Sequence, residues 1–226
     1  IDDVALNVIL NEGKPLPNAK AYKDYFRWVA TGLEEPMTTH ADRFKFNTGY
    51  GMSAYDKGSI FLSQLQYIIG KENFDNTLKK YFNDWSFRHP KPNDFIRSAE
   101  KVSGLELDWY LLDWAQSTMT IDYSINSVYG VDNRTKIVLK RIGQMGMPID
   151  LRIVLESGDY LDFTIPMTKM RGSKPLNNST LLDSWSWAKP YYEFWINIDS
   201  NDISKILIDP KNEMADIDRI NNSLDL

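Results

Sequence analysis

The sequence predicts an α+β fold of two domains, in which an α-helical lobe is followed by an antiparallel β-sandwich. As far as residue 115, apolar residues recur at the spacing of helices. From about Tyr123 they alternate with polar residues, as in strands, and no helical stretch separates these short strands. We therefore expect a helical domain over residues 1–121, a β-sandwich over residues 122–210 and a tail or linker over residues 211–226.

Each helix of the first domain is expected from an apolar stripe and a terminal signal. Gly32 and Gly104 stand where glycine ends a helix, and Ser53 with Asp56 forms the Ser-x-x-Asp pattern of a capping box. The capping box would place Tyr55 in the first turn of a helix. The expected helices cover residues 21–30, 53–70, 74–85, 93–104 and 107–115.

The strands are expected from alternation bounded by turn residues. Residues 149–155 alternate, Ser157-Gly158-Asp159 turns the chain, and residues 161–165 alternate on the return. Residues 192–199 form a third alternating stretch. Short strands in this order are typical of a small antiparallel sandwich.

Composition excludes several classes of protein. Hydrophobic residues make up 42% and charged residues 25% of the 226 positions, which is globular. A net charge of −5 disfavours nucleic-acid binding, no apolar run is long enough to span a bilayer, and without cysteine there are no disulfides or thiolate metal sites. The chain begins with Ile1 and no leader pattern follows, so we expect either a removed leader or a piece of a longer protein.

Tyr55 is the first candidate for chemistry. A phenol, with an ordinary pKa of about 10, is protonated at neutral pH and can donate a hydrogen bond to a developing oxyanion. The competing interpretation is a core or edge tyrosine, because Tyr55 shares a helical face with Leu62 and Leu65. Tyr50 is a weaker candidate of the same kind. Gly58, on that face, indicates a close approach by a backbone or a ligand.

Other polar and aromatic residues favour structural interpretations. His40 and His89 have no partner at metal-ligand spacing, so we interpret both as loop histidines. Glu12, before a glycine, is interpreted as a solvated turn residue. Aromatic residues crowded between Trp185 and Trp195 could fill the core or the seam between domains, or could bind a sugar or a peptide.

A series of motifs resembles one enzyme family. The matching residues are Glu35-Pro36-Met37-Thr38-Thr39-His40-Ala41-Asp42-Arg43-Phe44, Tyr50, Tyr55-Asp56-Lys57-Gly58, Phe87-Arg88-His89-Pro90, Leu107-Asp108-Trp109, Met147-Pro148, Trp187-Ala188-Lys189-Pro190 and Ile208-Asp209-Pro210. In this order they resemble the gluzincin metallopeptidases, the family of aminopeptidase N and leukotriene A hydrolase, and most closely bacterial members of the Bacteroidetes type. The resemblance implies the C-terminal part of a thermolysin-like catalytic domain, followed by that family's β-sandwich.

The same resemblance implies the chemistry. In that family two histidines of an H-E-x-x-H motif and a later glutamate hold zinc, and the motif glutamate is the general base. The resemblance gives Tyr55 the role of oxyanion donor and Tyr50 a place in the substrate site. This sequence contains no H-E-x-x-H. The zinc ligands and the base are therefore expected upstream of Ile1, and Glu12 is rejected as a ligand.

We therefore expect a fragment of a zinc-dependent aminopeptidase that is inactive alone and binds no metal. Its expected partners are a peptide substrate and the upstream catalytic half of the same protein, with no nucleic acid and no membrane span. A periplasmic or cell-surface location follows from the resemblance only. The alternatives are a non-catalytic peptide- or glycan-binding module and a degenerate family member.

Overall fold

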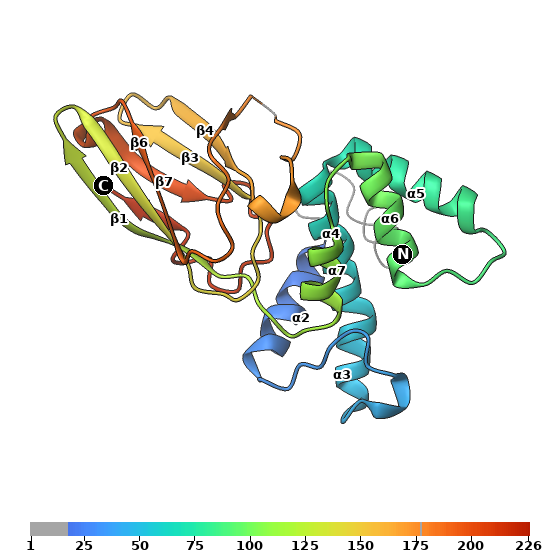
Figure 1. Ribbon diagram of the computed structural model, residues 1–226. Helices are drawn as coiled ribbons and strands as arrows, with labels where there is room; N and C mark the ends of the chain where they lie inside the picture. The colour runs from blue at the N-terminus through green and yellow to red at the C-terminus, as the bar shows by residue number, and fades with distance from the viewer. Residues whose placement is uncertain (1–17, 177) are drawn as a thin grey trace. The chain divides into compact units, whose positions relative to one another are not determined.

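The computed structural model describes residues 18–176 and 178–226, so Glu12 lies outside the described residues. The chain divides into two compact units, one ending at Met119 and one beginning at Thr120 (Figure 1). The first is helical and the second is built of strands. This arrangement confirms the expected fold class. No helix among the described residues has the length and apolar character needed to cross a bilayer.

The helices of the first unit lie close to their expected positions. The left-handed glycines at Gly32 and Gly104, with φ of +67° and +74°, confirm two expected helix ends. The expected start at Asn93 is one residue late, because Asp94 accepts a hydrogen bond from the amide of Lys91, the N-cap, which stabilises a first turn beginning at Pro92. The elements are α2 (Ala19–Ala30), a 3₁₀ turn (Ala41–Arg43), α3 (Asn47–Gly51), a π-helical turn (Met52–Asp56), α4 (Lys57–Ile69), α5 (Lys71–Trp85), α6 (Pro92–Ser103) and α7 (Asp108–Ala115).

The core of the helical unit is aromatic. Tyr25 of α2 packs against Trp114 of α7 with ring centroids 6.2 Å apart, and both are fully buried. Tyr110 of α7 stacks near Phe61 of α4 at 5.0 Å and donates its hydroxyl hydrogen bond to the Phe61 carbonyl. These contacts hold both α2 and α4 against α7.

The expected capping box at Ser53 is wrong. α3, the π turn and α4 form one unbroken helical run, since Gly51 and Lys57 at the two junctions both have right-handed helical dihedrals. Ser53 is buried inside this run, where its hydroxyl donates to the Glu35 carbonyl at 3.4 Å. Tyr55 therefore lies well after the start at Asn47, and the helix dipole does not act on it as on a first-turn residue.

The second unit contains two sheets. One has the order β1-β2-β6 and the other β5-β4-β3-β7-β8. Among the strands of the described residues, the short β4–β5 pair is parallel and the other pairs are antiparallel. In the register, Leu151 lies opposite Phe163 and Ile137 opposite Phe194, so the apolar faces of both sheets are buried in the sandwich. The strands are β1 (Tyr123–Val131), β2 (Arg134–Arg141), β3 (Ile149–Leu155), β4 (Tyr160–Ile165), β5 (Thr180–Leu181), β6 (Tyr191–Ile196), β7 (Ile203–Ile208) and β8 (Ser223–Asp225).

Residues 211–226 belong to the sandwich, unlike the tail or linker expected for them. β8 pairs with β7, and Met214 and Ala215 are buried. The carboxylates of Asp209 and Asp216 are also buried, and each accepts hydrogen bonds from two backbone amides. Asp209 and Asp216 thus satisfy backbone amides at the end of the described chain.

Candidate functional site

Tyr55 is an exposed phenol on the π-helical turn. Its side chain is 60% exposed, so it is not a core residue. A π turn inserts one residue into an α-helix and is frequent at functional sites. The turn therefore presents a hydrogen-bond donor to whatever lies in front of α4.

Tyr50, the second candidate, lies in α3, five residues before Tyr55. It is 43% exposed, and its ring meets that of Phe44 edge-on at 5.6 Å. Both tyrosines are therefore exposed on one continuous helical run, and both are available to a ligand.

Lys57 lies on the opposite side of the helix from Tyr55. Only 2% of it is exposed, and its ammonium lies 2.6 Å from Oε1 of Glu34, whose side chain is 5% exposed. The ammonium also donates to the Ser117 carbonyl at 3.2 Å. Burial raises the pKa of the neighbouring Tyr25 phenol, and the Glu34 carboxylate adds to that rise. Lys57 is thus a buried cation whose partners come from two distant loops.

Glu34 and Ser117 are the members of this site that sequence reasoning missed. Glu34 follows α2 in the loop before the 3₁₀ turn, and Ser117 follows α7. A buried ion pair between such distant positions leaves no periodic signal. The one available signal was Lys57 itself, a lysine on an otherwise apolar helix, which in a buried position requires a carboxylate partner.

The close approach expected at Gly58 is absent from the part of the chain that the structure describes. A Cβ added there would meet only the Ser53 carbonyl oxygen, at 3.9 Å. Gly58 lies three residues after Tyr55 and so beside it on the helix surface. The glycine leaves open space next to the phenol. The backbone interpretation is therefore wrong for the described residues, and the ligand interpretation stays a prediction.

Neither histidine forms a metal site with the described residues. The imidazole of His40 accepts a hydrogen bond from the Asp42 amide and lies 3.5 Å from the Asp42 carboxylate, both exposed. His89 is exposed in the loop before α6. The interpretation as loop histidines agrees with these positions.

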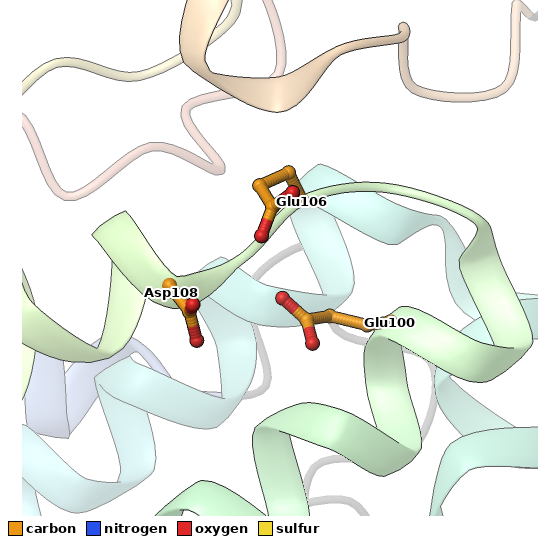
Figure 2. A group of neighbouring side chains, drawn as sticks. All are labelled: Glu100, Glu106 and Asp108. Atoms are coloured by element: carbon orange, nitrogen blue, oxygen red, sulfur yellow. The ribbon is translucent and has the colours of Figure 1, made fainter.

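One acidic group among residues 18–176 and 178–226 has the spacing of metal ligands. Figure 2 shows Glu100 from α6, Glu106 from the following loop and Asp108 at the start of α7 converging, with one oxygen of each within 4.8 Å of the others. Glu100 already accepts the Leu107 amide at 2.8 Å. Three carboxylates without nitrogen or sulfur do not fit a catalytic zinc, which takes histidine ligands in gluzincin sites. The described residues therefore do not fit the zinc that the resemblance implies.

The aromatic residues near the C-terminus of the chain are of two kinds. Trp185 is buried in the sandwich, with its ring 5.4 Å from that of Tyr123. Trp187, Tyr191 and Trp195 are between 44% and 54% exposed. On the outer face of β2 and β6, Arg134 lies 5.0 Å from the Trp195 ring centre. The core interpretation thus holds for Trp185 and fails for the other three.

Comparison with known proteins connects the helical unit to one family. Residues 20–114 match the peptidase family M1 domain. The chain is 22% identical over 142 residues to aminopeptidase N of Escherichia coli K12. The aligned region covers 59% of this chain and 16% of that protein. Tyr50, Tyr55 and the buried Lys57 lie within the matched range. The predicted resemblance to the gluzincin aminopeptidases is therefore confirmed, and its Bacteroidetes type stays a prediction.

The fold has a counterpart among solved structures. The chain is similar to the crystal structure of Legionella pneumophila aminopeptidase A in complex with aspartic acid, with a TM-score of 0.51 and 19% identity. That similarity covers 75% of this chain and 18% of the solved one. The 226 residues thus span less than a fifth of each of these relatives.

Proposed function

We propose that this chain, whose helical unit carries a peptidase family M1 match, is part of a zinc-dependent aminopeptidase that removes N-terminal residues from peptides. The observation that carries the proposal is the exposed Tyr55 phenol, presented by a π turn inside the matched segment. The similarity to aminopeptidase N supports it.

In this proposal Tyr55 donates a hydrogen bond to the oxygen of the scissile carbonyl as it becomes an oxyanion. The phenol keeps its proton, so it stabilises charge without taking part in proton transfer. Tyr50 lines the same face and contacts the substrate. Such a donor stabilises the transition state more than the ground state, because the oxygen becomes fully charged only during the reaction.

The zinc ligands and the general base belong, in this proposal, to sequence outside these 226 residues. Two facts support this: the sequence contains no H-E-x-x-H, and the chain spans only 16% of its aminopeptidase N relative. The proposal therefore assigns no step of metal chemistry to the described residues.

The test compares the chain alone with a longer product of the same gene that includes upstream sequence. We expect the longer protein to bind zinc stoichiometrically and to release N-terminal residues from peptide substrates. We expect the chain alone to do neither. Stoichiometric zinc on the chain alone would contradict the assignment of the ligands, and an inactive longer protein with an intact fold would favour a degenerate family member.

A second candidate function is peptide or glycan binding by Trp187, Tyr191 and Trp195. Their exposure favours it, and each ring has a cation near its face: Lys169 at Trp187, Lys140 at Tyr191 and Arg134 at Trp195. Exposed aromatic rings stack on sugars and contact peptides. Tryptophan fluorescence would be titrated with oligosaccharides and with peptides. A saturable change lost in Trp187→Ala but kept in Trp85→Ala, a tryptophan of α5, would support it. No saturable change would dismiss it.

A further inference from the structure

Lys57 is a buried charge with no part in the proposed hydrogen bond to the substrate. It lies two residues after Tyr55, at the junction where the π turn becomes α4. Residues two apart point to nearly opposite sides of a helix. The ammonium therefore points into the unit while the phenol points out.

The ammonium connects three segments that are distant in sequence. It contacts the Glu34 carboxylate at 2.6 Å in the loop after α2, and the Ser117 carbonyl at 3.2 Å after α7. Two further bonds reinforce the same junction. The Ser53 hydroxyl, inside the π turn, donates to the Glu35 carbonyl, and the Thr38 amide donates to the Ala115 carbonyl at 3.1 Å.

The energetics of this pair favour a role in geometry over a role in stability. Bringing two charges out of water costs several kcal/mol per ion, and replacing a buried pair by apolar side chains is often neutral or stabilising. A charged pair does, however, specify one arrangement, because any other leaves a buried charge without a partner. One defined arrangement matters at the π turn. If the turn changed to regular α-helix, α3 would rotate by about 100° relative to α4.

We propose that Lys57, through its buried ion pair with Glu34, is a positioning residue that fixes the π turn and thereby the direction of the Tyr55 phenol. The proposal rests on the proposed function for its catalytic consequence only. The conformation of the turn itself can be measured without any activity.

The first test measures the turn in the chain itself. 3-Fluorotyrosine is placed at position 55 and its ¹⁹F resonance is recorded in the wild type and in the Lys57→Met, Glu34→Leu double variant, which leaves no unpaired charge. Lys71→Met, which removes an exposed lysine paired with Asp75 on α5, is the matched control. We expect a displaced or broadened resonance in the double variant and the wild-type resonance in the control.

The second test measures activity in the longer, zinc-loaded protein. We expect the double variant to lose between about tenfold and a hundredfold in kcat, as misplacement of a reacting group by about 1 Å can cost, with a much smaller change in KM. If that double variant does not fold, Lys57→Met with Glu34→Gln carries both tests, since it also leaves no buried charge and keeps a polar side chain at position 34. An unchanged resonance together with unchanged kcat would overturn the proposal.

The outcomes separate this inference from the proposed function. If Tyr55→Phe leaves kcat unchanged, the proposed function fails, while the resonance still decides whether Lys57 fixes the turn. If Tyr55→Phe lowers kcat and the Lys57 variants alter neither kcat nor the resonance, this inference alone fails.

Discussion

Removing Lys57 alone should destabilise the helical unit strongly. Lys57→Met keeps a side chain of similar length in a site only 2% exposed, but it leaves the Glu34 carboxylate, 5% exposed, without its cation. Breaking a buried pair from one side costs about 3–5 kcal/mol, because an uncompensated charge remains buried. Replacing both partners, as in Lys57→Met with Glu34→Leu, should recover most of that loss.

The assay is urea denaturation followed by tryptophan fluorescence, with heat denaturation as a second measure. In a chain of this size, each kcal/mol of lost stability lowers the melting temperature by about 2–4 °C. A loss of about 3 kcal/mol should therefore lower the melting temperature of Lys57→Met by at least about 6 °C. The exposed Lys71–Asp75 pair is the control for loss of a surface charge. Lys71→Met should lower the free energy of unfolding by no more than about 0.5 kcal/mol. A Lys57→Met protein as stable as Lys71→Met, or a double variant less stable than the single one, would refute the reasoning.

Three further predictions concern other parts of the chain. Gly58→Ala should stabilise the helical unit by up to about 1 kcal/mol, since the nearest atom to the new Cβ lies at 3.9 Å, and a lower melting temperature would disprove this. Burial raises the pKa of Asp209 from 3.8 to about 7, against hydrogen bonds from the Met214 and Glu213 amides. The folded β unit therefore holds this proton more tightly than the unfolded chain. The free energy of unfolding of the β unit should fall by up to about 4 kcal/mol as pH rises from about 4 to 7, and should level off above pH 7. Denaturation across pH 4–8 should show this slope, and Asp209→Asn should reduce it; an equal slope in the variant would contradict the assignment. Asn133 has φ of +59° in the two-residue β1–β2 turn. Asn133→Gly should therefore leave the free energy of unfolding equal or higher, and Asn133→Val should lower it by at least about 1 kcal/mol. Equal melting temperatures for these two variants would argue against that turn.

The start of the central helix shows where sequence reasoning failed. Ser53 and Asp56 form an N-terminal pattern, and the preceding Asn47–Gly51 contains two glycines, each costing a helix about 1 kcal/mol. The structure nevertheless makes this segment helical. Gly49 allows the close packing, since an added Cβ would lie 3.3 Å from the Trp28 ring. Tertiary contact thus outweighs local propensity at this position.

The β unit shows the same division between local and distant information. The β3–β4 hairpin was predictable because alternation and the Ser157-Gly158-Asp159 turn lie within one short stretch. The pairing of β8 with β7 was not, because it brings an Asn- and Asp-rich segment into the sheet through contacts that the segment does not encode by itself. Only Asp132-Asn133, whose φ angles are both positive, offered an overlooked local signal for the β1–β2 hairpin.

For the candidate site, the sequence indicated Tyr55 and Tyr50 through family motifs, and the structure adds their exposure. It could not indicate Glu34 or Ser117, whose partner is Lys57 across the fold. Tyr50, Tyr55 and Lys57 lie in one motif-bearing stretch of sequence, whereas the partners of Lys57 are found only from three-dimensional contacts.

The most direct test of the account is the kcat of Tyr55→Phe in the longer, zinc-loaded protein. Tyr55→Phe removes one hydroxyl from a side chain that is 60% exposed, so stability and metal content should not change. Loss of one oxyanion donor should lower kcat by about two to three orders of magnitude, with little change in KM. A variant that keeps its metal and turns over within about twofold of the wild type would contradict the proposed role of Tyr55.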